Sequence, residues 1–250
     1  MKYIFLHIPK NGGTTLQQIV DDQYRKYQIY NIPDHEREER LKQLKEKGAL
    51  AKSFIKVVKG GHFSYGCHTF FKNPDQVTYF AMLRNPIDRA LSYYLYVKRT
   101  PEHYLYKTFT SENISLDDFI EREDLNMEVT NGQTKLLGGF GQKEICTSAT
   151  YEMAMEHLKQ TFFLVGIMER YVETLYMLKT ILGWSRPIRY NILNVNRDQK
   201  NELSKEQHRK LLELNKFDMA IYKYGIDTFE KKFQTFSESD FNNFKDNLQS

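Results

Sequence analysis

Four short apolar runs alternate with longer segments in which apolar positions recur every three to four residues. Nearly continuous runs of β-branched and aromatic residues are typical of strands buried on both faces of a sheet, whereas the longer spacing predicts amphipathic helices. The strands are expected at 2–8, 54–58, 77–83 and 162–167. The helices are expected at 14–27, 34–47, 86–98, 115–125, 149–160, 171–182 and 217–236, with another that begins after Ser204.

This alternation predicts an α/β fold in which a parallel sheet carries helices on both faces. We expect a single domain over residues 1–236. The remainder, 237–250, is expected to be a polar, frayed tail.

Composition narrows the class of protein. With 40% hydrophobic and 27% charged residues, the chain is neither a collagen, a coiled-coil rod nor wholly disordered. No apolar run approaches the roughly 20 residues of a membrane-spanning helix. Two cysteines, Cys67 and Cys146, cannot build a disulfide framework, so we expect a cytoplasmic protein. The net charge of +4, without a long basic block, favours small anionic ligands over nucleic acid.

The most informative segment is HIPKNGGTTL, positions 7–16, where an apolar strand leads through two glycines into a helix. Glycines let backbone N–H groups approach a ligand, and a helix N-terminus adds unpaired N–H groups with a partial positive charge. Lys10 adds a full charge, and Thr14 and Thr15 add hydroxyl donors. The segment therefore predicts an anion site, with an ordinary glycine-rich turn as the alternative.

This loop differs from the loop of ATP-binding P-loop proteins, in which the lysine follows the last glycine. Here Lys10 precedes both glycines, and no apolar strand ends in an aspartate suited to Mg²⁺. Glu169, after the last expected strand, is interpreted as an ion-pair partner. The expected fold is therefore P-loop-like, with an anion site that does not call for a metal.

A second junction, MLRNPIDRALSYY at positions 82–94, also leads from a strand into a helix. Arg84 stands at the carboxyl end of the strand, where open α/β sheets bind ligands, and Ser92 lies about two turns into the helix. A guanidinium and a hydroxyl suit a second phosphate. The alternative for Arg84 is a capping role or an ion pair with Asp88, and Arg89 is expected to be structural.

Together these junctions resemble the binding motifs of sulfotransferases that use 3′-phosphoadenosine 5′-phosphosulfate (PAPS). The likeness is closer to the carbohydrate branch that includes the heparan sulfate 2-O-sulfotransferases. HIPKNGGTTL resembles the family's 5′-phosphosulfate loop, and LRNPIDRALSYY resembles its 3′-phosphate element. GGHFSYG at 60–66 and FLVGIMER at 163–170 resemble two further family segments, and the order of the motifs agrees over residues 2–224.

The resemblance implies transfer of a sulfuryl group from PAPS to an acceptor hydroxyl, favouring a carbohydrate, with adenosine 3′,5′-bisphosphate (PAP) as product. It assigns the 3′-phosphate to Arg84 and Ser92, and gives Arg197, in the segment 194–200, a contact with the nucleotide. Lys10 would also stabilise the leaving phosphate. The residues implied to hold the 5′-phosphosulfate are Lys10, Asn11, Gly12, Gly13, Thr14 and Thr15.

Such a transfer needs a base for the acceptor hydroxyl, and a histidine near its usual pKa suits that role. His62 follows two glycines beside an expected strand and matches the family's base position, with a purely structural role as the alternative. His68 is a candidate to assist, and His7 is expected to be packed. The other histidines are expected at the solvated surface: His35, His103, His157 and His208.

His62, Cys67 and His68 do not predict a zinc site, because a structural zinc takes four ligands, and no metal is expected. Cys67 is instead expected to be a small buried hydrophobic residue.

Tyrosines and basic residues are concentrated at 93–109, where aromatic faces suit sugar rings or phenols and cations suit acidic groups. A helix packing face is the alternative. The segment NGQTK, 131–135, is expected near the acceptor cleft by analogy with the family. Two other functions stay open: a P-loop-like nucleotide kinase, and a module that binds PAP or another nucleotide without catalysis. The acceptor and the oligomeric state are not determined by the sequence.

Overall fold

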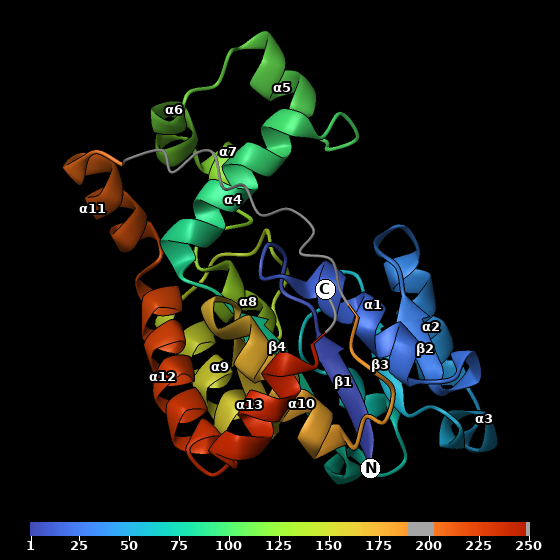
Figure 1. The fold of residues 1–250 in the computed structure, drawn as a ribbon. Coiled ribbons are helices and arrows are strands. Elements are labelled where there is room, and N and C mark those ends of the chain that lie inside the picture. Colours follow the sequence, from blue (N-terminus) through green and yellow to red (C-terminus); the bar gives the residue numbers. More distant parts are fainter. Residues whose placement is uncertain (190–202, 249–250) are drawn as a thin grey trace.

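The structure, a computed structural model, describes residues 1–189 and 203–248. Within this part of the chain five strands form one sheet in the order β2-β3-β1-β4-β5, and every neighbouring pair is parallel. Helices flank the sheet (Figure 1), so the expected α/β fold is confirmed. The strands are β1 Lys2–Leu6, β2 Ile29–Ile32, β3 Val57–Gly60, β4 Val77–Leu83 and β5 Phe162–Ile167.

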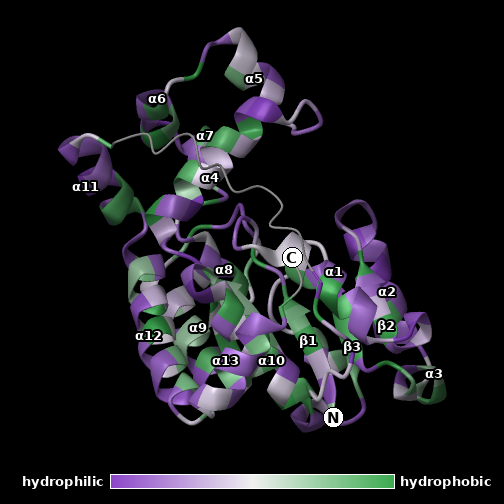
Figure 2. Ribbon diagram, in the orientation of Figure 1, coloured by the Kyte–Doolittle hydropathy of each residue, from purple (hydrophilic) through white to green (hydrophobic). Residues whose placement is uncertain are grey.

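The helices vary from single turns to the 18 residues of α12. Helix α2 is largely solvated: only Leu44 is buried in it, and it is largely hydrophilic in Figure 2. In the described residues no helix is both long enough and apolar enough to span a bilayer. The helices are α1 Gly13–Gln23, α2 Arg37–Glu46, α3 Ala49–Ser53, α4 Pro86–Arg99, α5 Tyr106–Ser111, α6 Leu116–Glu121, α7 Glu123–Asn126, α8 Gly132–Gly138, α9 Ser148–Gln160, α10 Tyr171–Leu182, α11 Lys205–Leu214, α12 Lys216–Phe233 and α13 Glu238–Asp246.

Two strands differ from expectation. Strand β2 was not expected, because its four residues alternate between buried and exposed positions too briefly to produce a clear pattern. Strand β3 begins at Val57, and the preceding Phe54, expected to start it, is 56% exposed. The shift places the carboxyl end of β3 at Gly60, directly before Gly61 and His62.

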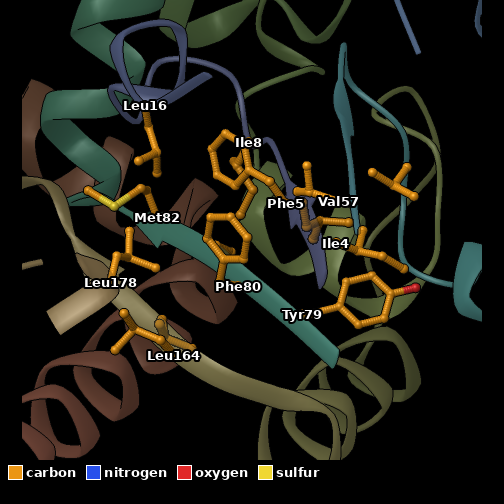
Figure 3. Packing of buried hydrophobic residues seen from close by; sticks show 14 of the residues in the cluster. Ile4, Phe5, Ile8, Leu16, Val57, Tyr79, Phe80, Met82, Leu164 and Leu178 are labelled. Atoms are coloured by element: carbon orange, nitrogen blue, oxygen red, sulfur yellow. The ribbon is translucent and has the colours of Figure 1, made fainter. Parts of the chain in front are cut away.

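The main hydrophobic core fills the space between the sheet and its helices. The rings of Phe5 on β1 and Phe80 on β4 stack with centroids 5.0 Å apart, since the two residues are paired in register. Leu16 of α1 packs near Met82 in the same cluster (Figure 3). Burying a side chain of this size stabilises the fold by about 1.5–3 kcal/mol.

A second, smaller cluster lies between α4, α5, α6, α7 and α11. These helices stand together beyond the ends of the strands (Figure 1). Tyr93 and Tyr94 of α4 are buried here, with the Tyr94 ring 5.5 Å from that of Phe119. For Tyr94, which does not line the cleft described below, the packing alternative is therefore correct.

The C-terminal segment is not the frayed tail that was expected. Helix α13 begins after Ser237, whose side chain accepts a hydrogen bond from the Asp240 N–H. Phe241 and Phe244, three residues apart on one face, lie with ring centroids 5.4 and 5.5 Å from Tyr176 of α10. Two aromatic side chains at helical spacing are enough to attach an otherwise polar segment to the core.

The strand order determines where a ligand can bind. From β1 the chain first builds β2 and β3 on one side, and then β4 and β5 on the other. The connection after β1 therefore runs to one side of the sheet and the connection after β4 to the other, and open parallel sheets bind ligands in the crevice at such a point. The loops after β1, β3 and β4 meet there.

Candidate active site

A cleft of about 740 Å³ lies at this edge of the sheet. It is lined by the loops after β1, β2 and β3, by the first turns of α1, and by α4 with the segment that follows it. Its volume falls within the range of about 300–1,000 Å³ that is usual for small-molecule sites. Lys10, Thr14 and His62 all line it, so the structure brings together the loop and the histidine that the sequence singled out.

The loop after β1 is built to present backbone N–H groups. Gly12 is the N-cap of α1 with φ 75°, in the left-handed region that favours glycine, and it has no side chain to cap the first turn. A Cβ on Gly13 would lie 2.0 Å from the ring of His7, so only glycine fits there. Thr14 is exposed at the start of the helix and Thr15 is buried. The first N–H groups of α1 are thus available to an anion.

The side chain of Asn11 points into the protein. It is fully buried, and its Nδ2 donates to the Met82 carbonyl oxygen at 2.7 Å and to Gln133 Oε1 at 2.8 Å. The side chain therefore ties the loop to β4 and α8, and only the backbone of Asn11 remains to contact a ligand.

Arg84 links the second junction to the first. Its Nη1 donates to the Lys10 carbonyl oxygen at 3.0 Å, while Gln133 bonds both its N–H and its carbonyl. The capping role belongs instead to Asn85, whose Oδ1 accepts from the N–H of Ile87 at 3.0 Å. Arg84 and the half-buried Ser92 do not line the cleft itself. Arg197 and the segment 194–200 lie outside the described residues.

Lys10 is held where positive charge is concentrated. Its φ of 69° is unusual for a residue with a Cβ, and such strain is often found at ligand clamps. Its Nζ lies 3.9 Å from the centroid of the Tyr96 ring. Burial lowers the pKa of Lys10 to about 8, assisted by the charges of Arg99 and Arg84. Positive charge is thus concentrated around the anion loop, as an anion-binding site requires.

Arg89, expected to be structural, supports the anion loop from the interior of the protein. It is 1% exposed; its Nε donates to the Pro9 carbonyl oxygen at 3.0 Å and its Nη1 to that of Val129 at 3.2 Å. Asp218 of α12 lies 4.0 Å from Nη1 and is fully buried. The same carboxylate accepts hydrogen bonds from the Thr134 N–H and hydroxyl, each at 2.7 Å.

The segment 131–135 was expected near the acceptor cleft; it supports the anion loop and Arg84 and does not line the cleft itself. Its four side chains are at least 94% buried, with Asn131 at 6% exposure and Gln133 at 0%. Glu169 also supports the site, because its Oε1 accepts a hydrogen bond from the backbone N–H of Asn85 at 2.8 Å.

We expect Arg89→Met to destabilise the protein by about 3–5 kcal/mol, because it leaves the buried Asp218 carboxylate without a cation and the loop carbonyls without donors. Urea unfolding measures the change. Arg209→Met, at an exposed arginine of α11 that pairs with Glu206, is the matched control and should cause a small change. Equal stability of the two variants would contradict this role of Arg89.

His62 is placed and oriented by a carboxylate that sequence reasoning missed. Asp34, in the short 3-10 helix Asp34–Glu36 after β2, lies with Oδ2 3.1 Å from His62 Nδ1. Its Oδ1 accepts a hydrogen bond from the His62 N–H at 2.7 Å. Burial opposes ionisation of Asp34, but hydrogen bonds from His62 lower its pKa to about 2. A carboxylate at Nδ1 fixes the proton there and leaves the Nε2 lone pair for chemistry.

His7 packs behind this pair, as expected. Its ring centroid is 5.0 Å from that of His62, and its Nδ1 lies 3.2 Å from the Gly60 carbonyl oxygen and 2.9 Å from Gln17 Nε2. Burial, with a contribution from the charge of His62, lowers the pKa of His7 to about 3. His7 is therefore neutral and structural.

Three other histidines lie where the sequence did not place them. His68 is outside the cleft lining, with Nδ1 2.9 Å from the hydroxyl of Tyr79, so it does not assist there. His157 is not solvated surface, because its ring stacks on Tyr65 at 3.7 Å. His103 lines the cleft.

Across 1–189 and 203–248, no three His, Cys, Asp or Glu side chains gather as metal ligands would.

The lining of the cleft also contains the carboxylate of Glu128, which the sequence did not single out. Glu128, between α7 and α8, accepts a hydrogen bond from Tyr93 Oη at 3.2 Å and from Tyr104 Oη at 2.9 Å. Tyr96 and His103 also line the cleft. Nothing in the local sequence marks Glu128, because its partners are 24 and 35 residues away.

Comparisons with known proteins identify the family and the fold. The profile of a sulfotransferase family matches residues 1–225. A sulfotransferase from Alicyclobacillus acidocaldarius is similar in structure, with a TM-score of 0.52 and 13% identity over 96% of this chain and 98% of that one. Mouse sulfotransferase SULT7A1 complexed with PAP gives a TM-score of 0.49 and 14% identity over 94% and 88%. At 13% identity, the likeness to the Alicyclobacillus acidocaldarius protein shows a similar fold and nothing beyond it. No curated protein matches the sequence.

Proposed function

This chain belongs to the sulfotransferase family, and we propose that it transfers the sulfuryl group of PAPS to an acceptor hydroxyl. One observation carries the proposal: a single cleft is lined by Lys10 and Thr14 of the anion loop and by the Asp34–His62 pair. An anion site next to an oriented imidazole is what transfer of a charged group to an alcohol requires.

The nucleotide would be held at two places. Lys10, the N–H groups of Gly12 and Gly13, and the Thr14 and Thr15 hydroxyls would bind the 5′-phosphosulfate, and Arg84 with Ser92 would bind the 3′-phosphate. The Arg84 bond to the Lys10 carbonyl supports this arrangement, because it holds the guanidinium beside the loop. Asn11 would contribute its backbone alone, since its side chain is buried.

The reaction follows from these positions. The acceptor oxygen would form a bond to sulfur as the bond from sulfur to the 5′-phosphate oxygen breaks, releasing PAP. His62 Nε2 would take the acceptor's hydroxyl proton, while Asp34 stabilises the imidazolium that results. Lys10 and the first N–H groups of α1 would neutralise the charge that grows on the leaving phosphate.

A carbohydrate is the acceptor that we favour within this proposal. Tyr96 and Tyr104 line the cleft, and Tyr104 is 56% exposed, so aromatic surface is accessible to a sugar ring. The resemblance of the two phosphate motifs to the carbohydrate branch of the family points the same way.

The two other functions are less well supported. A kinase is disfavoured because Lys10 precedes the glycines of its loop. A module without catalysis is disfavoured because it gives no role to the Asp34 carboxylate that orients His62.

Calorimetry with PAP and ATP, together with transfer of label from ³⁵S-PAPS, tests the proposal. We expect PAP to bind more tightly than ATP, and label to appear in an alcohol. Tight ATP binding without a preference for PAP would overturn it.

We also expect PAP affinity to fall as the pH rises through about 8. Below that value Lys10 is protonated in the free protein, and above it PAP must bind together with a proton. The phosphates of PAP are already ionised there, so Kd should rise by up to about tenfold per pH unit. Calorimetry at pH 7 and 9, in buffers of different ionisation enthalpy, measures this proton uptake. Lys10→Met should abolish the dependence, and its persistence in that variant would contradict the assignment.

A further inference from the structure

The wall of the cleft that faces the acceptor carries negative charge. Among the described residues that line the cleft, Lys10 is the one lysine or arginine. The carboxylates that line it are those of Asp34, Glu102 and Glu128. Asp34 is committed to His62, and Lys10 serves the nucleotide in the proposed function. Glu102 and Glu128 therefore determine the charge that an acceptor meets.

Glu128 is held in a fixed position. Tyr93 and Tyr104 each donate a hydroxyl hydrogen to one of its two oxygens, and its backbone carbonyl accepts from Arg89 Nη2 at 3.3 Å. Burial, together with the Glu128 charge, raises the pKa of Tyr93 and of Tyr104, so both stay protonated as donors. Arg89 also bonds the Pro9 carbonyl, which ties this wall to the anion loop.

His103 extends the same network. Its Nδ1 accepts from the Leu105 N–H at 3.2 Å, so its proton is on Nε2, which lies 3.4 Å from Tyr93 Oη. Burial lowers the pKa of His103, and a neutral ring does not offset the carboxylate.

The oxygens of Glu128 retain hydrogen-bonding capacity. An ionised carboxylate offers about four lone-pair sites and no donor, and the two tyrosines occupy two of them. Groups that can fill the others are donors, and a cationic donor makes the stronger, charge-assisted bond.

Other cations lie beside the cleft without lining it, among them Arg37, whose Nη1 donates to the His62 carbonyl oxygen at 3.1 Å. Lys143 Nζ is 4.2 Å from the centroid of the Tyr104 ring, and the charge of Arg99 acts on Lys10 at the phosphate end. An anionic acceptor would thus face Glu102 and Glu128 at the wall, which favours an acceptor different from the acidic one that the cations in 93–109 led us to expect.

We propose that Glu128, held between Tyr93 and Tyr104, is a specificity-determining residue that selects an acceptor alcohol bearing an ammonium group, such as an amino sugar. This inference rests on the proposed function and specifies its acceptor. Neutral sugars are weaker acceptors, and carboxylated or sulfated ones are rejected by like charge.

The test supplies ³⁵S-PAPS with three oligosaccharide pools of matched size: glucosamine oligomers, N-acetylglucosamine oligomers and galacturonate oligomers. We expect kcat/KM for the amine pool to exceed that for the carboxylated pool by at least about tenfold. Glu128→Gln should lower it for the amine pool by about tenfold, mainly through KM, and change the neutral pool by less than about threefold.

Control variants separate charge from structure. Glu128→Asp keeps the charge and should keep the preference for amines. Glu123→Gln, at an exposed glutamate of α7 outside the cleft lining, should change nothing. The thermal unfolding midpoint and PAP affinity of Glu128→Gln should match those of the parent protein.

The outcomes distinguish the two proposals. Label that enters the galacturonate pool best, or an equal loss on all pools in Glu128→Gln, overturns the role of Glu128 and leaves sulfuryl transfer intact. Label in none of the pools, even though PAP binds, counts against the amine acceptor, and transfer to water that does not depend on His62 counts against the proposed function itself.

Discussion

Replacing His62 by glutamine is expected to lower kcat by about 10²–10⁴-fold and to leave the Kd for PAP within about twofold, because a positioned general base contributes that much and does not hold the nucleotide. Glutamine can still bond Asp34, so the loop around Gly61 should keep its shape. Single-turnover transfer of ³⁵S from PAPS measures the rate, and calorimetry measures the affinity.

Two further variants show whether the loss belongs to the base. Asp34→Asn removes the carboxylate beside Nδ1 and should also lower kcat with PAP affinity unchanged, because the imidazolium is no longer stabilised. His208→Gln, at an exposed position on α11, should behave like the parent protein. A His62→Gln variant that retains near-normal turnover would remove His62 from the mechanism and favour a binding module without catalysis.

Replacing Lys10 by methionine should weaken both binding and turnover. Loss of a charge-assisted contact is expected to raise the Kd for PAP by about 10–100-fold. Because Lys10 also neutralises the leaving phosphate in the proposed reaction, kcat should fall by a further factor of about 10². The aliphatic stem that lies against Tyr96 is kept in this variant, so lost packing does not account for the change.

Affinity by calorimetry and single-turnover rates at saturating PAPS separate the two effects of Lys10. Lys26→Met, at an exposed lysine beyond α1, is the control for a general loss of positive charge. A Lys10→Met variant that binds PAP normally would place the anion elsewhere and undermine the two-phosphate arrangement.

The elements that follow from local physics were predicted closely. Strands β4 and β5 and helix α10 have the expected bounds, because their apolar runs and periodicity are long and are ended by Arg84, Met168 and Gly183. Short or half-buried elements were missed, since four residues of β2 carry too little pattern. The contact between Tyr176 and the Phe residues of α13 spans about sixty positions, and periodicity within the tail alone does not reveal it.

The functional residues, like the elements of the fold, divide into those that the sequence identified and those that only the tertiary structure revealed. The sequence by itself determined the anion loop, because a strand, two glycines and a helix N-terminus are consecutive and their geometry is local. It also singled out Arg84 and His62, which stand directly after strands. The tertiary structure decided which groups act on them: Asp34 reaches His62 from another loop, and Glu128 is held by two tyrosines from a separate helical cluster. Such pairs form because parallel strands bring distant loops to one edge of the sheet, and no spacing along the chain encodes that meeting.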